Sequence, residues 1–321
     1  TIADDGKYLI VPEGESVPED MDKDITVLQQ PIQNIYLAAS AAMDMFVATD
    51  ALDAVRFSSL KADGWYIEEA KKAMEDGDII YAGKYSAPDY EMILNENCGL
   101  AIENTMILHT PEVKEQLEKF GIHVLVDYSS YEPEPLGRTE WVKLYGLLTG
   151  HEAQADKAFA EEKSAFEEVK NSVADEADQE PKTVAFFYIT SNGQANVRKS
   201  ADYLPKMIEL AGGKYIFNDL GTDEEGLSTM NMGMEDFYAG AKDADYIIYN
   251  STIDGELGSL DELLKKSTLL KDFKAVQAGN VWCTTKNLYQ ESMSVGAMLE
   301  DIHAIFSGSQ EDGTYLYKLQ S

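Results

Sequence analysis

Arginine is scarce in this sequence, which has only Arg56, Arg138 and Arg198. We place Arg56 at the end of a predicted strand, Arg138 after a loop, and Arg198 between a strand and a helix. A guanidinium donates several hydrogen bonds in a fixed plane and therefore suits anionic or oxygen-rich ligands. Because ligands bind at the carboxyl ends of parallel strands, we expect these arginines to contact such a ligand. The alternative is that each arginine anchors a loop through an ion pair.

Further candidate binding residues follow the predicted strands in the same way. Aromatic rings with a polar tip suit the wall of a wet cleft around a large planar or chelated ligand. The aromatic candidates are Trp65, Tyr85, Tyr131, Tyr188 and Tyr289. We expect Lys84 and Lys286 to add positive charge, and Glu103, Asn104 and Asn250 to orient the ligand. Packing in the core or on the surface is the alternative for each aromatic residue.

Enzyme signatures are missing from the sequence. It contains no G-x-G-x-x-G, G-x-x-x-x-G-K-[ST] or G-x-S-x-G motif. The four histidines, His109, His123, His151 and His303, are scattered and form no H-x-x-x-H pair. We therefore predict no catalytic residue, no protein-bound metal and no cofactor. The two cysteines, Cys98 and Cys283, stand far apart in mostly apolar surroundings, which favours buried, unpaired thiols.

The charge balance excludes several partners. With 26 Lys and Arg against 58 Asp and Glu, the formal net charge is −32 at pH 7. Such a surface repels phosphate backbones and anionic lipid headgroups, so we expect no nucleic-acid partner. No apolar run approaches the roughly 18 residues that a membrane span needs. The sequence starts with Thr1 rather than Met and therefore looks trimmed, which leaves a removed export signal open.

Strands and helices that would position these residues alternate along the chain, which is typical of parallel sheets with crossover helices. Strands are predicted over 34–37, 53–57, 79–82, 100–102, 124–126, 183–189, 215–217, 246–249 and 281–284. Helices are predicted over 38–49, 65–75, 90–96, 111–120, 201–211, 235–241, 260–266 and 293–306, with Ser200 capping the fifth. The polar start, 1–24, is predicted to be a loose arm with at most one short strand.

A long helix separates the two halves. Residues 151–177 contain no Gly or Pro and carry one apolar stripe at helical spacing. We therefore predict an arm at 1–24, an α/β lobe at 25–148, an inter-lobe helix at 149–179 and a second α/β lobe at 180–321. The halves also echo each other: Glu91 starts a helix whose following strand ends at Asn104, and Glu235 starts one whose strand ends at Asn250.

This order of motifs resembles the extracytoplasmic substrate-binding proteins of ABC importers for ferric siderophores, haem and cobalamin. The resemblance covers about residues 25–321, and each motif is only moderately specific. The motifs are P-D-Y-E-M-I-L at 88–94, L-A-I-E at 100–103, G-I-H-V-L-V at 121–126, P-L-G-R-T-E-W at 135–141, Glu235 with D-Y-I-I at 245–248, and K-A-V-Q-A-G-N-V at 274–281. One departure is Cys98-Gly99, where the family usually has Pro-Asp before the strand.

The resemblance implies two Rossmann-like lobes joined by a single long backbone helix, the helical-backbone metal-receptor type. It also implies that Glu91 and Glu235 engage arginines of a permease dimer, and that the protein is an extracytoplasmic monomer with a lipid anchor. We expect the ligand to be a ferric siderophore held without direct protein–metal bonds. Haem and corrinoid stay open as ligands, and a chelatase-like enzyme or an adhesin-type interaction module are the competing classes.

Overall fold

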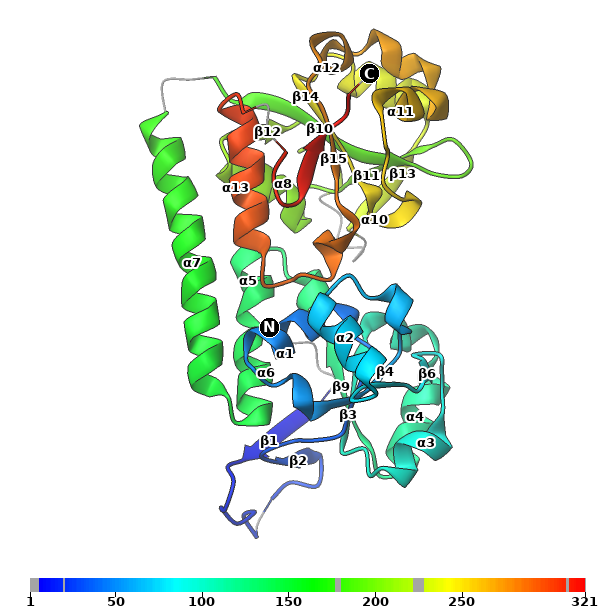
Figure 1. The fold of residues 1–321 in the computed structure, drawn as a ribbon, viewed down its shortest axis with the longest axis vertical. Helices are drawn as coiled ribbons and strands as arrows, with labels where there is room; N and C mark the ends of the chain where they lie inside the picture. Colours follow the sequence, from blue (N-terminus) through cyan, green and yellow to red (C-terminus); the bar gives the residue numbers. More distant parts are fainter. Residues whose placement is uncertain (1–5, 20, 177–179, 222–227, 310–311, 321) are drawn as a thin grey trace. The chain divides into compact units, whose positions relative to one another are not determined.

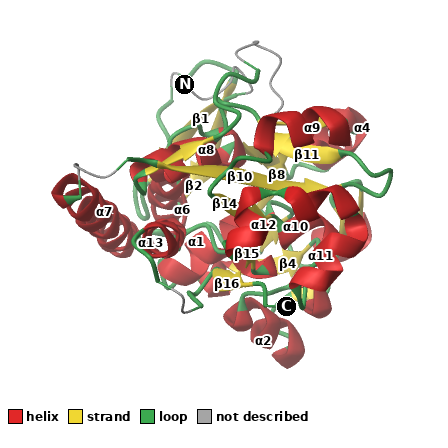
Figure 2. Cartoon of the chain, turned by 90° about the horizontal axis from the view of Figure 1, so that it is seen from above, coloured by secondary structure: helices red, strands yellow, loops and turns green. Residues whose placement is uncertain are grey.

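The alternation of strands and helices builds two α/β units in the computed structural model of the chain, which describes residues 6–19, 21–176, 180–221, 228–309 and 312–320. Unit 1 draws on Thr1–Ser130, Arg138–Glu161 and Gln290–Met293, and unit 2 on Tyr131–Gly137, Glu162–Tyr289 and Ser294–Ser321. Helices flank the strands on both sides (Figure 2). The predicted α/β class is confirmed, but two short segments lie in the unit opposite to the one that the predicted boundaries assign.

Unit 1 contains a five-stranded sheet in the order β5-β4-β3-β8-β9, and every pairing in it is parallel. Its strands are β3 (Ile35–Leu37), β4 (Val55–Ser58), β5 (Ile80–Tyr81), β8 (Leu100–Asn104) and β9 (His123–Asp127). The connections contain η1 (Ser40–Ala42), α1 (Met43–Ala48), η2 (Leu52–Ala54), η3 (Ala62–Gly64), α2 (Glu68–Asp76), the hairpin β6 (Gly83–Lys84) and β7 (Ala87–Pro88), α3 (Tyr90–Asn95), η4 (Thr105–His109) and α4 (Pro111–Lys119). After β9 come η5 (Ser129–Tyr131), α5 (Pro135–Glu140) and α6 (Val142–Thr149).

The N-terminal arm is more ordered than predicted. β1 (Lys7–Val11) and β2 (Ile25–Gln29) form a parallel pair along their full length. The Tyr8 hydroxyl donates to the carbonyl of Val124 at 2.7 Å, and Tyr8 packs against the core of unit 1. The prediction of a loose arm is wrong because each strand is short and the polar, Pro-containing connection hides their alternation.

Unit 2 contains a seven-stranded mixed sheet in the order β13-β11-β10-β14-β15-β16, with β12 also paired to β10. Its strands are β10 (Lys182–Ile189), β11 (Ala195–Arg198), β12 (Gly213–Tyr215), β13 (Thr229–Met232), β14 (Tyr246–Tyr249), β15 (Val281–Thr284) and β16 (Leu316–Lys318). β10, β12, β14 and β15 are parallel, whereas β11 and β16 run against their neighbours. Its helices are α8 (Tyr203–Leu210), α9 (Met234–Ala241), α10 (Ser251–Asp254), α11 (Leu260–Lys266), η6 (Thr268–Asp272), α12 (Lys274–Ala278), η7 (Lys286–Tyr289) and α13 (Val295–Phe306).

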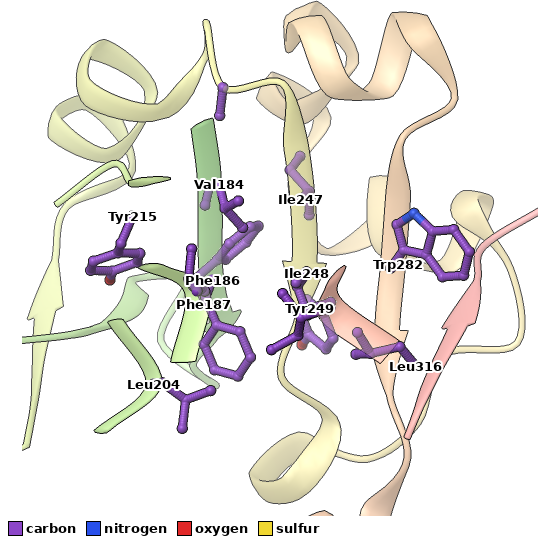
Figure 3. Close-up of a cluster of buried hydrophobic side chains, with 14 of the residues drawn as sticks. Val184, Phe186, Phe187, Leu204, Tyr215, Ile247, Ile248, Tyr249, Trp282 and Leu316 are labelled. Carbon is purple, nitrogen blue, oxygen red and sulfur yellow. The ribbon is translucent and has the colours of Figure 1, made fainter. Parts of the chain in front are cut away.

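The core of unit 2 is rich in aromatic side chains, which lie on both faces of its inner strands. Phe186 and Phe187 on β10 lie beside Ile248 and Tyr249 on β14 and near Trp282 on β15 (Figure 3). All five side chains are at most 1% exposed. Such burial of large apolar surface is the main favourable term in folding.

Helix α7 (Glu152–Asp175) is the predicted long helix, visible as a single column in Figure 1. Its apolar stripe serves two cores: Ala155 and Phe159 pack in unit 1, whereas Phe166 and Val169 pack in unit 2. The division between the units falls within the helix, after Glu161. No helix in the described ranges is long and apolar enough to cross a membrane.

Several details differ from the sequence-based expectations. The helix predicted from 201 starts at Tyr203, and the carboxyl of Asp202, not Ser200, caps it by accepting from the Leu204 amide. The helix predicted from 38 is the 3-10 turn η1 followed by the short helix α1. Strands β11, β13 and β16 were not predicted, since each has only three or four residues, too few to establish a period.

Candidate ligand-binding site

A cavity of about 400 Å³ opens at the carboxyl edge of the unit 1 sheet. Its walls come from the residues that follow β3, β4, β5 and β8, so four strands of one parallel sheet contribute to it. Parallel strands end at the same edge, which is where ligands bind in open α/β sheets. The side chains on which the site depends are Ser40, Lys61, Tyr81, Lys84, Tyr85 and Asn104.

Positive charge and aromatic surface meet in this cavity. Lys61 and Lys84 are both exposed, and Asp63 is the one carboxylate among its lining residues. The Lys61 ammonium lies over the ring of Tyr81, 5.5 Å from its centroid. Tyr85 packs against the core of unit 1 and also lines the cavity, so one face of its ring is fixed by packing. This combination suits a ligand with anionic or oxygen-rich groups and a flat surface.

The β6–β7 hairpin places Lys84 and Tyr85. Gly83 has φ +87°, and a Cβ atom there would lie 2.4 Å from the carbonyl oxygen of Ala87, so the hairpin requires glycine. The hydroxyl of Tyr36, a core residue of β3, donates to the Gly83 carbonyl at 3.1 Å. The hairpin is therefore tied to the sheet immediately before Lys84.

The asparagines at the ends of β8 and β14 perform the same structural task in both units. Asn104 accepts from the Met106 amide at 2.9 Å and donates to the Ala38 carbonyl at 3.0 Å. Asn250 accepts from the Thr252 amide at 3.2 Å and caps α10. Asn104 lines the cavity and Asn250 is buried. Asn104 thus uses both ends of its amide on the nearby backbone, and Asn250 uses its Oδ1 in the same way.

Arg56 lies at the edge opposite to the one expected. It is the second residue of β4, and its guanidinium donates to the carbonyls of Gly77 and Asp78, which precede β5. It also pairs with Glu96, which follows α3, at 2.7 Å. All these partners stand before strands, at the amino edge of the sheet, so the expected placement of Arg56 at the carboxyl edge is wrong.

Arg198 does not lie at the carboxyl edge of its sheet. It ends β11, which runs antiparallel to β10, and the pairing of Phe187 with Val197 puts Arg198 level with Phe186, in the middle of β10. Its side chain pairs with Asp202 at 3.4 Å and lies over the ring of Phe186. The expected placement fails because a strand end is a carboxyl edge only when the strand is parallel to its neighbours.

Arg138 supports a loop at the carboxyl edge of β9. Its guanidinium donates to the carbonyl of Ser130 at 2.7 Å. The adjacent carboxyl of Asp127 accepts from the Ser129 amide at 2.7 Å and from the Tyr145 hydroxyl. Burial raises the pKa of Asp127, while these hydrogen bonds and the charge of Arg138 oppose that rise. Within unit 1, Arg138 therefore anchors a loop, which is the alternative to ligand contact given for each arginine.

Trp65 and Glu103 are core residues, not cavity walls. Trp65 is 3% exposed, packs in the core of unit 1 and donates from Nε1 to the Ser58 hydroxyl at 3.1 Å. Glu103 is fully buried on β8, and neither carboxyl oxygen has a hydrogen-bond partner. Burial raises the pKa of Glu103 to about 8. Neither side chain reaches the cavity surface where the sequence analysis placed it.

In unit 2, Tyr188, Lys286 and Tyr289 gather with Asn250 at the carboxyl edge of β10, β14 and β15. Tyr188 is half-buried against the core, whereas Tyr289 is 43% exposed. The backbone amide of Lys286 donates to the Glu256 carboxylate at 2.9 Å, which fixes the start of η7. Tyr131 also belongs to unit 2 and is 55% exposed. The positions of Tyr188, Asn250, Lys286 and Tyr289 in the sequence of unit 2 agree with the predicted edge.

A larger cavity, of about 550 Å³, lies in unit 2 at the start of β10 and β12. Its charged lining residues are Glu176, Glu180 and Glu209 against Lys182 and Lys214. It stands at the amino edge of the sheet and carries a carboxylate excess, which disfavours an anionic ligand. The smaller cavity of unit 1 is therefore the better candidate site.

The two glutamates predicted to dock a permease are exposed in equivalent places. Glu91 is in the first turn of α3, which Asp89 caps by accepting from the Met92 amide at 3.0 Å. Glu235 is in the first turn of α9. Each helix leads into an inner strand of its sheet, β8 or β14, so each glutamate stands at a carboxyl edge.

Sequence reasoning missed Lys61 and left Tyr81 out of the site. The signal for Lys61 was its position in the loop after the predicted strand 53–57, the criterion by which Lys84 was chosen. The described residues contain no group of three or more His, Cys, Asp or Glu able to hold a metal ion. Both cysteines are buried and unpaired, and burial raises the pKa of the Cys98 thiol to about 11.

Comparison with known families and relatives agrees with this architecture. The family described as "Periplasmic binding protein" matches residues 50–288. An uncharacterized lipoprotein of Methanocaldococcus jannaschii is 25% identical over 98% of this chain and 80% of its own length. A second uncharacterized lipoprotein of that organism is 25% identical over 88% of this chain and 68% of its own length.

Solved structures share the fold. A periplasmic haem-binding protein from Pseudomonas aeruginosa superimposes with a TM-score of 0.70 and 17% identity, covering 90% of this chain and 98% of that one. A protein of an ABC-type Fe3+-hydroxamate transport system from Saccharomonospora viridis gives 0.62 and 18% identity, over 87% and 94%. At these identities the likeness concerns the fold alone.

Proposed function

We propose that this chain, which belongs to the periplasmic binding protein family, captures a ferric siderophore outside the cytoplasmic membrane and delivers it to the permease of an ABC importer. Family membership makes it an extracytoplasmic solute-binding protein. The iron chelate, the delivery step and a lipid anchor are parts of the proposal. Two relatives described as lipoproteins support the anchor.

The observation that carries the proposal is the charge of the unit 1 cavity. The whole chain has a net charge of −32, yet this cavity offers Lys61 and Lys84 against one carboxylate, Asp63. A local cationic site on an acidic protein attracts anionic solutes to that site. The cavity's volume of about 400 Å³ falls in the range of small-molecule sites.

A ferric siderophore fits this chemistry because the chelator fills the coordination sphere of the iron. The protein then needs cations and hydrogen-bond donors that face oxygen atoms, and it needs no metal ligands of its own. Lys61, Lys84 and the Ser40 hydroxyl are groups of that kind in the cavity lining. Tyr81 and Tyr85 would contact the flat surfaces of a catecholate or the backbone of a hydroxamate.

Haem is the second candidate, and the two tyrosines in the cavity favour it. Tyrosine ligates haem iron in some proteins, and Tyr81 or Tyr85 would be the ligand here. The two lysines would then pair with the haem propionates. In that case Tyr81→Phe or Tyr85→Phe abolishes a charge-transfer band of the bound haem, whereas a siderophore site keeps its iron spectrum in both variants.

Titration of tryptophan fluorescence with four probes tests the proposal. The probes are a ferric trihydroxamate, a ferric tris-catecholate, hemin and cyanocobalamin. We expect one of the ferric siderophores to bind most tightly, and Lys61→Met with Lys84→Met to weaken it about 10- to 100-fold, as the loss of two charge-assisted hydrogen bonds does. Tightest binding of hemin or cyanocobalamin contradicts the siderophore assignment.

The matched control removes two exposed lysines of unit 1 that do not line the cavity. Lys72 pairs with Asp76 on α2, and Lys119 ends α4. Lys72→Met with Lys119→Met changes the net charge equally and should leave the affinity unchanged. An equal loss of affinity in both double variants would assign the effect to overall charge and reject the cavity as the site.

A further inference from the structure

A four-residue segment from the C-terminal part of the sequence is built into unit 1. Gln290–Met293 belongs to unit 1, although Tyr289 before it and Ser294 after it belong to unit 2. Its hydrogen-bond partners stand 224 to 251 residues earlier in the sequence. We call this segment the clip.

Gln290 holds the loop after β4. Its side chain is completely buried, its Nε2 donates to the Gly64 carbonyl at 2.8 Å, and its Oε1 accepts from the Tyr66 amide at 2.8 Å. Both ends of one amide group thus satisfy backbone groups on either side of Trp65. Removing a buried partner of this kind leaves backbone groups without compensation, which is costly.

The clip also holds the turn after β3. The Ser292 hydroxyl donates to the Ala41 carbonyl at 2.6 Å. The backbone amide of Met293 donates to the Asp44 carboxylate at 2.7 Å. These two bonds fix η1 and the first turn of α1.

Both loops that the clip holds are walls of the cavity. Ser40 in η1 lines it, as do Lys61, Asp63 and Gly64 around η3. Lys61 is the residue immediately before η3, whose last residue accepts from Gln290. We propose that Gln290 is a positioning residue that sets the place of Lys61 in the ligand site, and this inference rests on the proposed function of the cavity.

The first test compares two buried glutamines of unit 1. Gln290→Met keeps the length of the side chain and removes both hydrogen bonds. Gln30→Met is the matched control, since Gln30 is 8% exposed and its Nε2 donates to the Leu147 carbonyl and to Glu152, away from the cavity lining. We expect Gln290→Met to weaken the tightest-binding probe of the four about tenfold, and Gln30→Met to leave it within twofold. Equal affinities of wild type and Gln290→Met overturn the proposal.

A double-mutant cycle separates positioning from a general loss of structure. If Gln290 acts through Lys61, then Gln290→Met costs little once Lys61→Met is present, and the two factors do not multiply. Multiplying factors would reject action through Lys61. If Gln290→Met does not fold, Ser292→Ala is the second variant, since it removes one hydrogen bond of the clip. We expect it to weaken binding threefold or less, and we expect this loss to disappear when Lys61→Met is also present. Full additivity of the two losses rejects the proposal.

Amide hydrogen exchange tests the clip without any ligand. We expect faster exchange of the Tyr66 amide and of residues 61–66 in Gln290→Met but not in Gln30→Met. If wild type binds none of the probes, the proposed function fails while this measurement still decides whether Gln290 holds the wall. Unchanged exchange over 61–66 would overturn the inference by itself.

Discussion

Glu103 was predicted to contact the ligand, but its burial instead makes the stability of the protein depend on pH. Its neighbour on the same face of β8, Ala101, lies in an apolar cluster with Tyr36 and Ile93. Neither carboxyl oxygen of Glu103 has a hydrogen-bond partner, and burial raises its pKa to about 8. The folded protein therefore holds Glu103 protonated at neutral pH, whereas the unfolded chain ionises it above a pKa of about 4.5.

This difference predicts a pH-dependent stability. Below pH 4.5 both states are protonated, and the contribution of Glu103 is fully present. Between about pH 4.5 and 8 the unfolded chain releases the proton, so the free energy of unfolding falls by about 1.4 kcal/mol per pH unit. Glu103→Gln should remove this slope, and urea denaturation from pH 5 to 9 measures it.

The control is Glu112→Gln, which changes an exposed carboxyl on α4. It should keep the pH dependence of wild type. A Glu103→Gln variant with the wild-type slope would show that the buried carboxyl ionises as freely in the folded state as in the unfolded chain.

At the scale of elements, the two halves repeat one unit of structure. In each, a helix with an acidic first turn leads into an inner strand of the sheet, and an asparagine at the end of that strand caps the next helical turn. The helices are α3 and α9, the strands β8 and β14, and the asparagines Asn104 and Asn250. The first amides of a helix have no carbonyl acceptor within the helix, and an asparagine side chain at the N-cap accepts from one of them. This capping explains why an asparagine stands between each strand and the helical turn that follows it.

The junction of α6 with α7 depends on one glycine. A Cβ atom on Gly146 would lie 2.5 Å from the Cβ of Ala155 and 2.9 Å from the His151 carbonyl oxygen. Gly146→Ala should therefore overpack the helix junction and lower the free energy of unfolding by about 1–3 kcal/mol. Differential scanning calorimetry measures this effect.

Gly137 in α5 provides the matched comparison, because a Cβ there would meet no atom closer than 3.5 Å. Gly137→Ala should be neutral or stabilising by up to about 1 kcal/mol, since alanine favours helix more than glycine does. A Gly146→Ala protein as stable as Gly137→Ala would mean that α7 shifts away from α6 without penalty.

At the scale of the whole chain, each unit includes a short segment from the part of the sequence that otherwise forms the other unit. Tyr131–Gly137 belongs to unit 2, Gln290–Met293 belongs to unit 1, and α7 contributes to both. A fragment that ends at the long helix would therefore lack the clip, including Gln290. Each unit needs residues from both halves of the sequence to complete its core and its loops.

The proposed delivery to a permease gives a prediction for the intact transport system. Glu91→Ala with Glu235→Ala should reduce uptake in proteoliposomes that hold the cognate permease at least tenfold, because the acidic docking groups are lost. The affinity for the chelate should stay within twofold, since neither residue lines the cavity.

The control removes two exposed glutamates near the C-terminal ends of helices, Glu118 on α4 and Glu209 on α8. Glu118→Ala with Glu209→Ala changes the net charge equally and should leave uptake unchanged. Weaker binding of the chelate by the purified Glu91→Ala, Glu235→Ala protein would place these glutamates in ligand binding and reject the docking role.

The sequence by itself determined the α/β class, the long helix and most of the strands. Hydrophobic periodicity is local, so a stretch such as 246–249 or 152–175 can be identified without its neighbours. The motifs around the helix also led to the family, which the match over residues 50–288 supports. Lys84, Tyr85 and Asn104 were found because a position after a strand is also a local property.

Only the tertiary structure decided which residues meet. β11 is antiparallel and ends beside the middle of β10, and the second residue of β4 faces Glu96 because α3 ends there. Spacing along the chain contains neither fact, so Arg56 and Arg198 were misplaced. The clip was equally hidden, because Gln290 and Gly64 are 226 residues apart and only packing brings a buried amide to its two backbone partners.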